Sequence, residues 1–343
     1  MKAISYLIDD ASVGGVTRTL DSQIALLEPQ FDVTQSIVNA YHPLPPQLGE
    51  DAVVIHFTPS WGKLPFLTLL RAQRPNRPVV LVEHTYTASL ERQCVHNVTR
   101  FRTMLKLAYS LVDAVVCVSH GQARWIRDAR LAPAEKIRVI RSATDCRHLF
   151  DIAPPSRGLE RPMRLAAYGR YTRQKGFDVL IEAMHSVQPD IASLTIAGYG
   201  PDEDALKRAA AGLPHVHVGT GITDLEAFLS DCDAVVVPSR WEAFGLVASE
   251  ARSAARPIIV SDLDGLSEQV SRDAGIAVVS EDPRLLADAI YRLGGSDLAA
   301  MGRAARTSVA GHFEQHVRGY NDLLVSLTTA VEAHEHDYLS PAA

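Results

Sequence analysis

A segment near residue 240 combines an apolar strand, a glycine loop and a helix start between two carboxylates. The apolar run 235–237 is of strand length, and the loop 244–246 opens a helix. The first amides of a helix lack intrahelical partners and lie at the positive end of its dipole, which suits a diphosphate. Glu242 and Glu250 flank this loop, and their oxygens could accept hydrogen bonds from hydroxyls along one extended ligand. Taken alone, they could equally be a loop charge and a solvated residue of a first helical turn.

Two cations follow another apolar run, 164–168. Arg170 comes directly after Gly169, and Lys175 stands just before a second glycine that opens a helix. Arginine supplies a planar fork of donors and lysine a point charge, so these two side chains could converge on one diphosphate. The next apolar run ends in the loop 198–201, Gly-Tyr-Gly-Pro, which lacks the third glycine of a dinucleotide fingerprint and does not predict an NAD site.

The elements that must position these groups are apolar runs of strand length, alternating with helical patterns along the whole chain. Such a pattern indicates parallel sheets covered by helices on both faces, so the sequence predicts an α/β protein of two Rossmann-like, doubly wound domains. Ligands of such folds bind beyond the carboxyl ends of the strands, which predicts a site in a cleft between two facing domains. The expected strands are 3–8, 53–56, 79–82, 114–118 and 137–140, then 164–168, 194–197, 215–218, 234–237, 257–260 and 276–279.

A cluster of chain-breaking residues at 153–158, Ala-Pro-Pro-Ser-Arg-Gly, marks the expected junction between the domains. We expect an acceptor-side domain over 1–155 and a nucleotide-binding domain over 160–315. A helix at about 316–331 is expected to pack back on the first domain, and 334–343 to form a flexible tail.

The composition is that of a folded protein without membrane spans. The chain has 343 residues, 47% hydrophobic and 22% charged, which favours about two domains. No apolar run approaches the length of a membrane span, and the first ten residues do not resemble a signal peptide, so we expect a cytoplasmic protein. Four scattered cysteines indicate neither a zinc site nor a disulfide framework.

The charge is distributed unevenly. Residues 1–150 carry 17 basic and 13 acidic groups, whereas 151–343 carry 17 and 27. The basic stretch 92–106 and the arginines of 124–130 could attach the first domain peripherally to the inner face of an anionic membrane, or could be a solvated face over a core-facing helix. The whole chain is acidic and has no recognisable reading module, so we expect no nucleic-acid partner.

Three motifs occur in a characteristic order: Gly-Arg-x4-Lys-Gly at 169–176, Gly-x-Gly-Pro at 198–201, and Pro-Ser-x2-Glu-x-Phe-Gly-x4-Glu at 238–250. Over roughly 164–280 the chain therefore resembles the second domain of retaining nucleotide-sugar glycosyltransferases of family four, which have the GT-B fold. The first half matches more weakly, through Gly14-Gly15 and Glu83-His84-Thr85. It departs at 141–143, where the family usually has Pro-Asn-Gly, and Ala243 stands where glycine is frequent.

The resemblance implies a retaining, metal-independent hexosyltransferase without a cofactor. It would move a sugar from a nucleotide-diphosphate donor, with UDP-sugar favoured and GDP-mannose next, to a glycan or lipid-linked acceptor in polysaccharide or glycolipid biosynthesis. By similarity, Arg170 and Lys175 offset charge on the leaving group, while Glu242 and His84 lie at the transferred sugar. The implied donor-binding residues are Gly14, Gly15, Gly169, Gly198, Gly200, Thr220, Ile222, Ala243, Phe244, Gly245, Leu246 and Glu250.

Other interpretations remain open at this point. Gly14-Gly15 could be only a strand-to-helix turn, and His84 a histidine satisfied at a sheet end. The pairs Asp231/Asp233 and Asp262/Asp264 have the Asp-x-Asp spacing of a metal signature in another glycosyltransferase fold, but turn chemistry is the favoured explanation and no metal is expected. The same architecture also serves phosphorylases, nucleotide-sugar epimerases and non-catalytic sugar-nucleotide-binding proteins.

Overall fold

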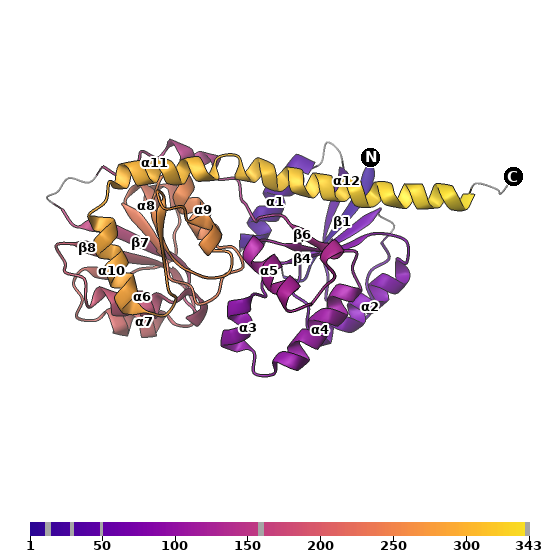
Figure 1. The fold of residues 1–343 in the computed structure, drawn as a ribbon, viewed down its shortest axis with the longest axis horizontal. Coiled ribbons are helices and arrows are strands. Elements are labelled where there is room, and N and C mark those ends of the chain that lie inside the picture. The colour runs from indigo at the N-terminus through magenta and orange to yellow at the C-terminus, as the bar shows by residue number, and fades with distance from the viewer. Residues whose placement is uncertain (11–14, 28–30, 49–50, 157–160, 340–343) are drawn as a thin grey trace. The chain divides into compact units, whose positions relative to one another are not determined.

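The computed structural model describes residues 1–10, 15–27, 31–48, 51–156 and 161–339, and it divides into two compact units (Figure 1). Each unit is made of separate segments of the chain. The first unit comprises Met1–Tyr86, Cys94–Thr144 and Phe313–Ala343, and the second comprises Thr87–Gln93 and Asp145–His312.

The first unit contains a six-stranded parallel sheet in the order β2-β1-β3-β4-β5-β6. The central strands are buried along their whole length, as expected for a parallel sheet with helices on both faces. The strands are β1 (Lys2–Ile8), β2 (Phe31–Ile37), β3 (Ala52–Ile55), β4 (Val79–Glu83), β5 (Ala114–Cys117) and β6 (Ile137–Val139). The helices of this unit are α1 (Gly15–Leu27), α2 (Leu64–Gln73), α4 (Val98–Ser110), α5 (His120–Asp128) and, from Phe313 on, α12 (His312–Leu339), whereas α3 (Ala88–Cys94) belongs to the second unit except for its last residue.

The second unit repeats this plan with the strand order β12-β11-β10-β7-β8-β9, all pairs being parallel. The predicted pair of doubly wound α/β units is thus confirmed. Its strands are β7 (Met163–Arg170), β8 (Ala192–Tyr199), β9 (Val216–Val218), β10 (Ala234–Val237), β11 (Ile258–Ser261) and β12 (Gly275–Val278). Its helices are α6 (Phe177–Met184), α7 (Glu203–Ala210), α8 (Leu225–Ser230), α9 (Leu246–Ser253), α10 (Pro283–Gly294) and α11 (Leu298–Val309).

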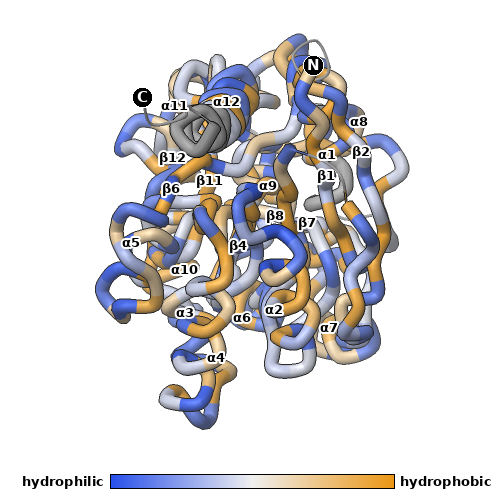
Figure 2. The backbone as a smooth tube through the Cα atoms, turned by 90° about the vertical axis from the view of Figure 1, so that its right-hand side faces the viewer, coloured by the Kyte–Doolittle hydropathy of each residue, from blue (hydrophilic) through white to orange (hydrophobic). Residues whose placement is uncertain are grey.

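Alternate residues of β7, β10 and β11 in the second unit serve two separate cores. Leu165 and Ala167 of β7 join the apolar cluster that includes α6 and α10, whereas Ala166 and Tyr168 join the cluster under α9. Successive side chains of a strand point to opposite faces, so a continuous apolar strand fills both cores. Figure 2 shows the contrast between such a strand, the hydrophobic β11, and the hydrophilic helix α5.

Side-chain caps set several helix starts. Asp224, Asp282 and Asp297 precede α8, α10 and α11, and each carboxylate accepts a hydrogen bond from an amide of the first turn. Asn97 and Ser119 do the same for α4 and α5. These residues supply acceptors to amides that the helix leaves unpaired. In the described residues, no helix has the length and apolar character needed to cross a bilayer.

The structure corrects three details of the sequence prediction. Strand β2 was not predicted, because an edge strand with the sequence Phe-Asp-Val-Thr-Gln-Ser-Ile exposes many of its residues and carries no apolar run. The segment 334–339, expected to be a tail, continues α12 in a stretch free of proline and glycine. The long segment of the second unit begins at Asp145, before the expected junction, since Leu149 and Ile152 pack in its core, and the short segment Thr87–Gln93 also belongs to this unit.

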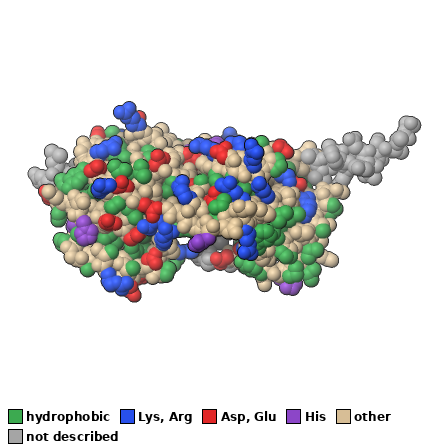
Figure 3. Space-filling model, turned by 60° about the horizontal axis from the view of Figure 1, so that its bottom comes forward, with side chains coloured by type: hydrophobic (Ala, Val, Ile, Leu, Met, Phe, Trp, Pro, Cys, Tyr) green, Lys and Arg blue, Asp and Glu red, His purple; other side chains and the backbone are tan. Residues whose placement is uncertain are grey.

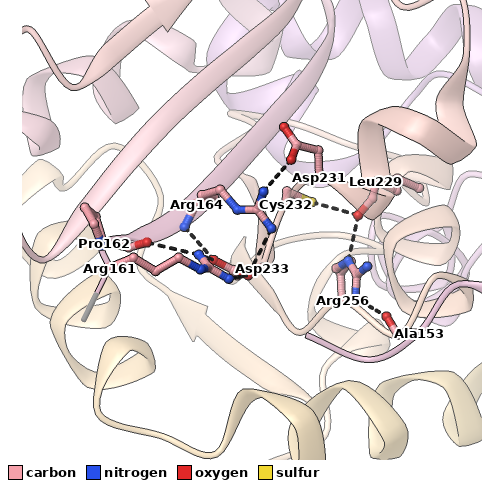
Figure 4. Close-up of polar contacts among 9 residues, drawn as sticks. All are labelled: Ala153, Arg161, Pro162, Arg164, Leu229, Asp231, Cys232, Asp233 and Arg256. Carbon is pink, nitrogen blue, oxygen red and sulfur yellow. Dashed lines mark hydrogen bonds and ion pairs between the residues drawn. The ribbon is translucent and has the colours of Figure 1, made fainter. Parts of the chain in front are cut away.

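Asp231 and Asp233 lie just before β10, at the amino edge of the sheet, where guanidinium groups surround them (Figure 4). The buried carboxylate of Asp233 accepts hydrogen bonds from Arg161 Nη1 and Nη2 at 2.6 and 2.7 Å and from the Arg164 amide at 2.8 Å. Asp231 pairs with the Arg164 side chain. Burial raises the pKa of Asp233, but these hydrogen bonds outweigh that effect and leave the pKa below its usual value.

We expect Asp233→Asn to lower the free energy of unfolding by about 2 kcal/mol, because it removes one charge of a largely buried pair. Asp231→Asn is the matched control, and since its side chain is 82% exposed the loss should stay within about 0.5 kcal/mol. Urea denaturation measures both. A group with a lowered pKa stabilises the fold above its unfolded pKa, so the Asp233→Asn deficit should shrink as the pH falls below about 4. Equal losses in the two variants would contradict this assignment.

Candidate functional site

The second unit places its sequence motifs at the carboxyl edge of its sheet. Strand β7 lies between β10 and β8 in the sheet. After β7 the chain adds β8 and β9 on one side of it and then returns to add β10, β11 and β12 on the other side. Open α/β sheets bind ligands at such a switch point. The loops after β7, β8 and β10 carry the three motifs. Gly169 pairs in register with Gly198, which brings the first two loops together.

Glycines let these loops approach closely. A Cβ atom on Gly198 would lie 1.9 Å from the carbonyl oxygen of Gly169, and one on Gly200 would lie 2.4 Å from that of Tyr171. Close packing of the two loops therefore explains why glycine is present at positions 198 and 200. Gly169 has a φ of 140°, and a Cβ there would lie 3.7 Å from the side chain of Lys175, so this lysine crosses the glycine turn.

Lys175 and Glu242, from the loops after β7 and β10, form an ion pair. Lys175 Nζ lies 2.5 Å from Glu242 Oε2, and the two side chains are only 19% and 13% exposed. The Ser239 hydroxyl donates to the same oxygen at 3.3 Å. Two motifs that are 67 residues apart in the sequence thus meet in one polar cluster.

Arg240 also connects these two loops, and the sequence analysis did not select it. This buried guanidinium makes a two-bond contact with Asp178, both distances being 2.8 Å, and its Nε lies 2.7 Å from Glu281. Its backbone amide donates to Gln174, next to Lys175. The hydrogen bonds from Arg240 to the two carboxylates raise its pKa, so it remains charged. The sequence signal that could have identified Arg240 was its position between an apolar strand and Glu242, together with an aspartate in the first turn of α6.

Glu250 lies in α9 and is almost fully buried at 4% exposure. Tyr168 of β7, another residue that the sequence analysis did not select, donates its hydroxyl to Glu250 Oε2 at 2.9 Å. Burial and the nearby carboxylate both raise the pKa of Tyr168, which keeps this hydroxyl a donor. The sheet therefore fixes the carboxylate of Glu250 on the helix that follows β10.

The loop before α9 offers its backbone. Gly245 caps the helix with a φ of 91° and without a side-chain hydrogen bond. Gln269 Nε2 donates to the carbonyls of Phe244 at 2.5 Å and Gly245 at 3.1 Å, which fixes the turn. The side chains of Ala243 and Phe244 are buried, while Leu246 is half-buried. A ligand at this helix start would accordingly meet amide groups.

The remaining predicted residues of the second unit take different positions. Arg170 is exposed at the end of β7, and among the described residues its side chain has no recorded hydrogen bond or ion pair. The Thr220 carbonyl accepts a hydrogen bond from the Gly198 amide at 3.1 Å. Ile222 packs against the apolar cluster under α9, which indicates a packing role.

Asp264 is a half-buried residue that connects the loop of Glu242 with the start of α3. Its Oδ2 accepts the Thr87 hydroxyl at 2.8 Å and the Glu242 amide at 3.3 Å, and its Oδ1 accepts the Ser89 amide at 3.1 Å. Burial raises its pKa despite these donors. The two residues of the Asp262/Asp264 pair therefore differ in environment. Asp262 is exposed, whereas Asp264 accepts hydrogen bonds from the start of α3 and from the loop of Glu242.

In the first unit, His84 follows β4 at the carboxyl edge of its sheet. The buried carboxylate of Glu83 accepts the amides of Thr85 and Tyr86 at 2.9 and 3.0 Å and the Tyr109 hydroxyl at 2.8 Å, so the turn that carries His84 is fixed. Burial lowers the pKa of His84 to about 4, which makes its imidazole neutral near pH 7. Gly15 begins α1, and Gly14 lies outside the described residues.

Helix α4 settles one alternative about the basic stretch 92–106. Leu105 and Tyr109, on the apolar face of the helix, are fully buried within the first unit. This face is therefore a core face and has no apolar stripe left for insertion into a bilayer. Arg100 lies over the ring of Trp61 at 5.7 Å, and Trp61 is itself 41% exposed.

We expect Asp264→Asn to increase amide hydrogen exchange in the α3 segment Ala88–Cys94 about fivefold, since the loss of a helix cap costs about 1 kcal/mol. Asparagine tolerates the positive φ of 43° at this position, so strain does not enter the comparison. Asp262→Asn is the control and should leave exchange unchanged. Equal exchange in both variants, measured by mass spectrometry on this segment, would overturn the capping role.

Comparisons with known proteins agree with this geometry. A family model described as glycosyl transferases group 1 matches residues 162–295, and one described as Glycosyltransferase Family 4 matches 46–148. An uncharacterised glycosyltransferase of Methanocaldococcus jannaschii is 32% identical over 53% of this chain, which spans 45% of that relative's length. A phosphatidyl-myo-inositol mannosyltransferase of Mycobacterium leprae is 26% identical over 81% of this chain and 80% of its own.

The fold has close counterparts among solved structures. The Anabaena protein HepE, solved in complex with UDP and glucose, superimposes with a TM-score of 0.73 at 18% identity, over 95% of this chain and 100% of that chain. At this identity the likeness concerns the fold, which is GT-B. The two family models cover motif-bearing parts of both halves, in the order that the sequence motifs predicted. The chain belongs to the group 1 glycosyltransferases of family four.

Proposed function

We propose that this protein transfers a hexose from a nucleoside-diphosphate donor to a glycan or lipid-linked acceptor, with retention at the anomeric carbon and without a metal ion. The observation that carries the proposal is the cluster at the switch point of the second unit. There the Lys175–Glu242 pair, the start of α9 and the buried Glu250 occupy neighbouring loops and one helix. A cation, free amides and fixed carboxylates suit a ligand with a diphosphate between two hydroxyl-bearing rings.

Each group has a separate role in the proposal. Lys175 and the exposed Arg170 meet the diphosphate and offset the negative charge that grows on it as the sugar leaves. Glu250 accepts hydrogen bonds from the ribose hydroxyls, and Glu242 accepts them from the transferred sugar. Glu242 and Lys175 already hold each other in place, so little reorganisation is needed when the donor binds.

The proposed step keeps the acceptor and the leaving group on one face of the sugar. The bond from the anomeric carbon to the diphosphate oxygen breaks as the acceptor oxygen bonds to the same carbon. The proton of the acceptor hydroxyl passes to the departing phosphate oxygen. Lys175 supplies positive charge at that oxygen, which is the contribution that a bound metal makes in other transferases.

UDP-sugar is the first donor that we propose, and GDP-mannose the second. The UDP and glucose complex of HepE supports the first, and the printed activity of the mycobacterial relative, a mannosyltransferase, supports mannose as the sugar of the second. Thermal unfolding with UDP, GDP, ADP and their sugars distinguishes these donors, because a ligand that binds only the folded state raises the midpoint.

We expect Glu250→Gln to weaken donor binding at least tenfold, since a hydrogen bond to a charged group contributes about 1.5–3 kcal/mol. Lys175→Ala should lower kcat about 100-fold through the lost charge stabilisation. Glu182→Gln, an exposed carboxylate of α6, is the control and should change neither quantity. Calorimetric donor titration and a transfer assay with anomeric analysis of the product measure these effects.

Other outcomes of that assay would replace the proposal. Turnover that requires inorganic phosphate would identify a phosphorylase, and conversion of the donor sugar without any acceptor would identify an epimerase. Donor binding without turnover across glycan and lipid acceptors would identify a non-catalytic binding protein. Wild-type behaviour of both Lys175→Ala and Glu250→Gln would remove the candidate site altogether.

We also propose that the protein is cytoplasmic and attaches electrostatically to an anionic membrane through its first unit, next to a lipid-linked acceptor. Basic residues outnumber acidic ones in 1–150, and the face of α4 outside the core carries Arg100 and Lys106. Figure 3 shows hydrophobic side chains gathered on part of the first unit's surface. Trp61 of the same unit is an exposed aromatic residue. Charge and exposed aromatic rings both favour the headgroup region.

We expect co-sedimentation with phosphatidylglycerol vesicles at 0.1 M salt, reduced at least tenfold in the double variant Arg100→Gln, Lys106→Gln, because each charge contributes about 1 kcal/mol. The double variant Arg208→Gln, Arg303→Gln changes the net charge equally in the second unit and serves as the control. Equal binding of both double variants, or binding that persists at high salt, would contradict attachment through α4.

A further inference from the structure

Two histidines at the carboxyl edge of the first unit contact each other. His56 directly follows β3 and His84 directly follows β4, and these strands are neighbours in the sheet. His56 Nδ1 lies 3.0 Å from His84 Nε2, and the rings are stacked with centroids 5.3 Å apart. One of the two nitrogens must carry the proton and the other must accept it, so the imidazoles cannot both be charged.

The position of His56 is costly for a polar side chain. It is 6% exposed, and its Nε2 atom is buried without a hydrogen-bond partner among the residues that the structure describes. A buried polar atom without a partner is unfavourable, so an apolar side chain would stabilise the fold more at this position. Within the described chain, the one hydrogen bond recorded for the His56 side chain is with His84. This pattern indicates that His56 serves the orientation of His84.

A series of contacts through Tyr6, Gln23 and His316 supports the ring of His56. The Tyr6 ring lies 5.0 Å from that of His56, and the Tyr6 hydroxyl accepts a hydrogen bond from Gln23 Nε2 at 2.8 Å. His316 of α12 contacts the other end of this amide, with Nε2 3.1 Å from Gln23 Oε1, and its Nδ1 lies 2.8 Å from the Arg141 carbonyl. Side chains from β1, α1 and α12 therefore fix the ring on which His84 rests.

The surroundings keep the pair neutral. Burial lowers the pKa of His56 well below its usual value and that of His84 to about 4, and His316, whose pKa burial also lowers to about 4, opposes any further positive charge. A neutral imidazole pair joined through His56 Nδ1 and His84 Nε2 leaves two further ring nitrogens, His56 Nε2, which is buried, and His84 Nδ1. In the described part of the chain no partner for His84 Nδ1 is recorded.

We propose that His56 is a positioning residue: it holds His84 by Nε2 and thereby presents Nδ1 of His84 to a substrate hydroxyl at the carboxyl edge of the first unit. The inference rests on the proposed function, because a sugar-transfer reaction supplies substrates that carry such hydroxyls. It adds which nitrogen makes the contact and which residue sets it. Since the same bond couples the tautomers of both rings, His56 also determines whether Nδ1 donates or accepts.

Two substitutions of His56 separate this role from simple packing. The amide of asparagine can occupy the place of Nδ1, whereas that of glutamine reaches the place of Nε2, which has no partner. We expect His56→Asn to keep kcat/KM within about threefold of wild type and His56→Gln to lower it at least tenfold. Thermal unfolding of both variants verifies that they fold.

The double variant tests whether His56 acts through His84. In a His84→Ala background, His56→Gln should cause no further loss, because its effect is transmitted by the absent imidazole. ¹⁵N NMR of the ring nitrogens, without any donor, should show one defined neutral state of His84 in wild type and in His56→Asn, and averaged tautomers in His56→Gln.

Equal kcat/KM in His56→Asn and His56→Gln, or a His56→Gln loss that persists in the His84→Ala background, would overturn the inference. Failure of the proposed function has a different signature. In that case the wild-type protein transfers no sugar and Lys175→Ala changes nothing, while the NMR comparison still reports whether His56 sets the state of His84.

Discussion

The second unit depends on the connection between the loops after β7 and β10. Lys175 and Glu242 pair across it at 2.5 Å, and the guanidinium of Arg240 fixes Asp178 on one side and Glu281 on the other. A Cβ atom on Gly176 would lie 2.1 Å from the Pro238 carbonyl, so the backbones are in direct contact. Neither loop can move alone without exposing unpaired charge, and the candidate site is therefore held before any ligand binds.

Polar burial is concentrated at the two carboxyl edges. Glu250 in the second unit and Glu83 in the first are buried carboxylates that accept tyrosine hydroxyls, and the half-buried Asp264 accepts the Thr87 hydroxyl. Burial of such groups is unfavourable unless every oxygen finds donors, and an apolar residue would often stabilise a fold more. Their placement beside Glu242, α9 and His84 is more readily explained by precision in a binding site than by stability.

The sequence predicted the framework and the order of the motifs, because buried parallel strands are apolar throughout and the glycine turns have fixed spacing. The edge strand β2 escaped prediction since half of it faces solvent. Tyr168, Arg240 and His56 escaped for another reason. Each acts through a partner 28 to 82 residues away, and nothing in local spacing indicates that Tyr168 will meet Glu250 or that His56 will meet His84.

The two edges differ in how completely their polar groups are satisfied. In the second unit, Lys175 and Glu242 neutralise each other, so the pair can exist without ligand at low cost. In the first unit, the His56–His84 pair has a buried nitrogen without a partner among the described residues, and burial is the largest cause of the lowered pKa that keeps His56 neutral. A site that must stabilise charge is thus preassembled from opposite charges, whereas a site that must contact sugar hydroxyls is built from uncharged groups that do not compete for the diphosphate.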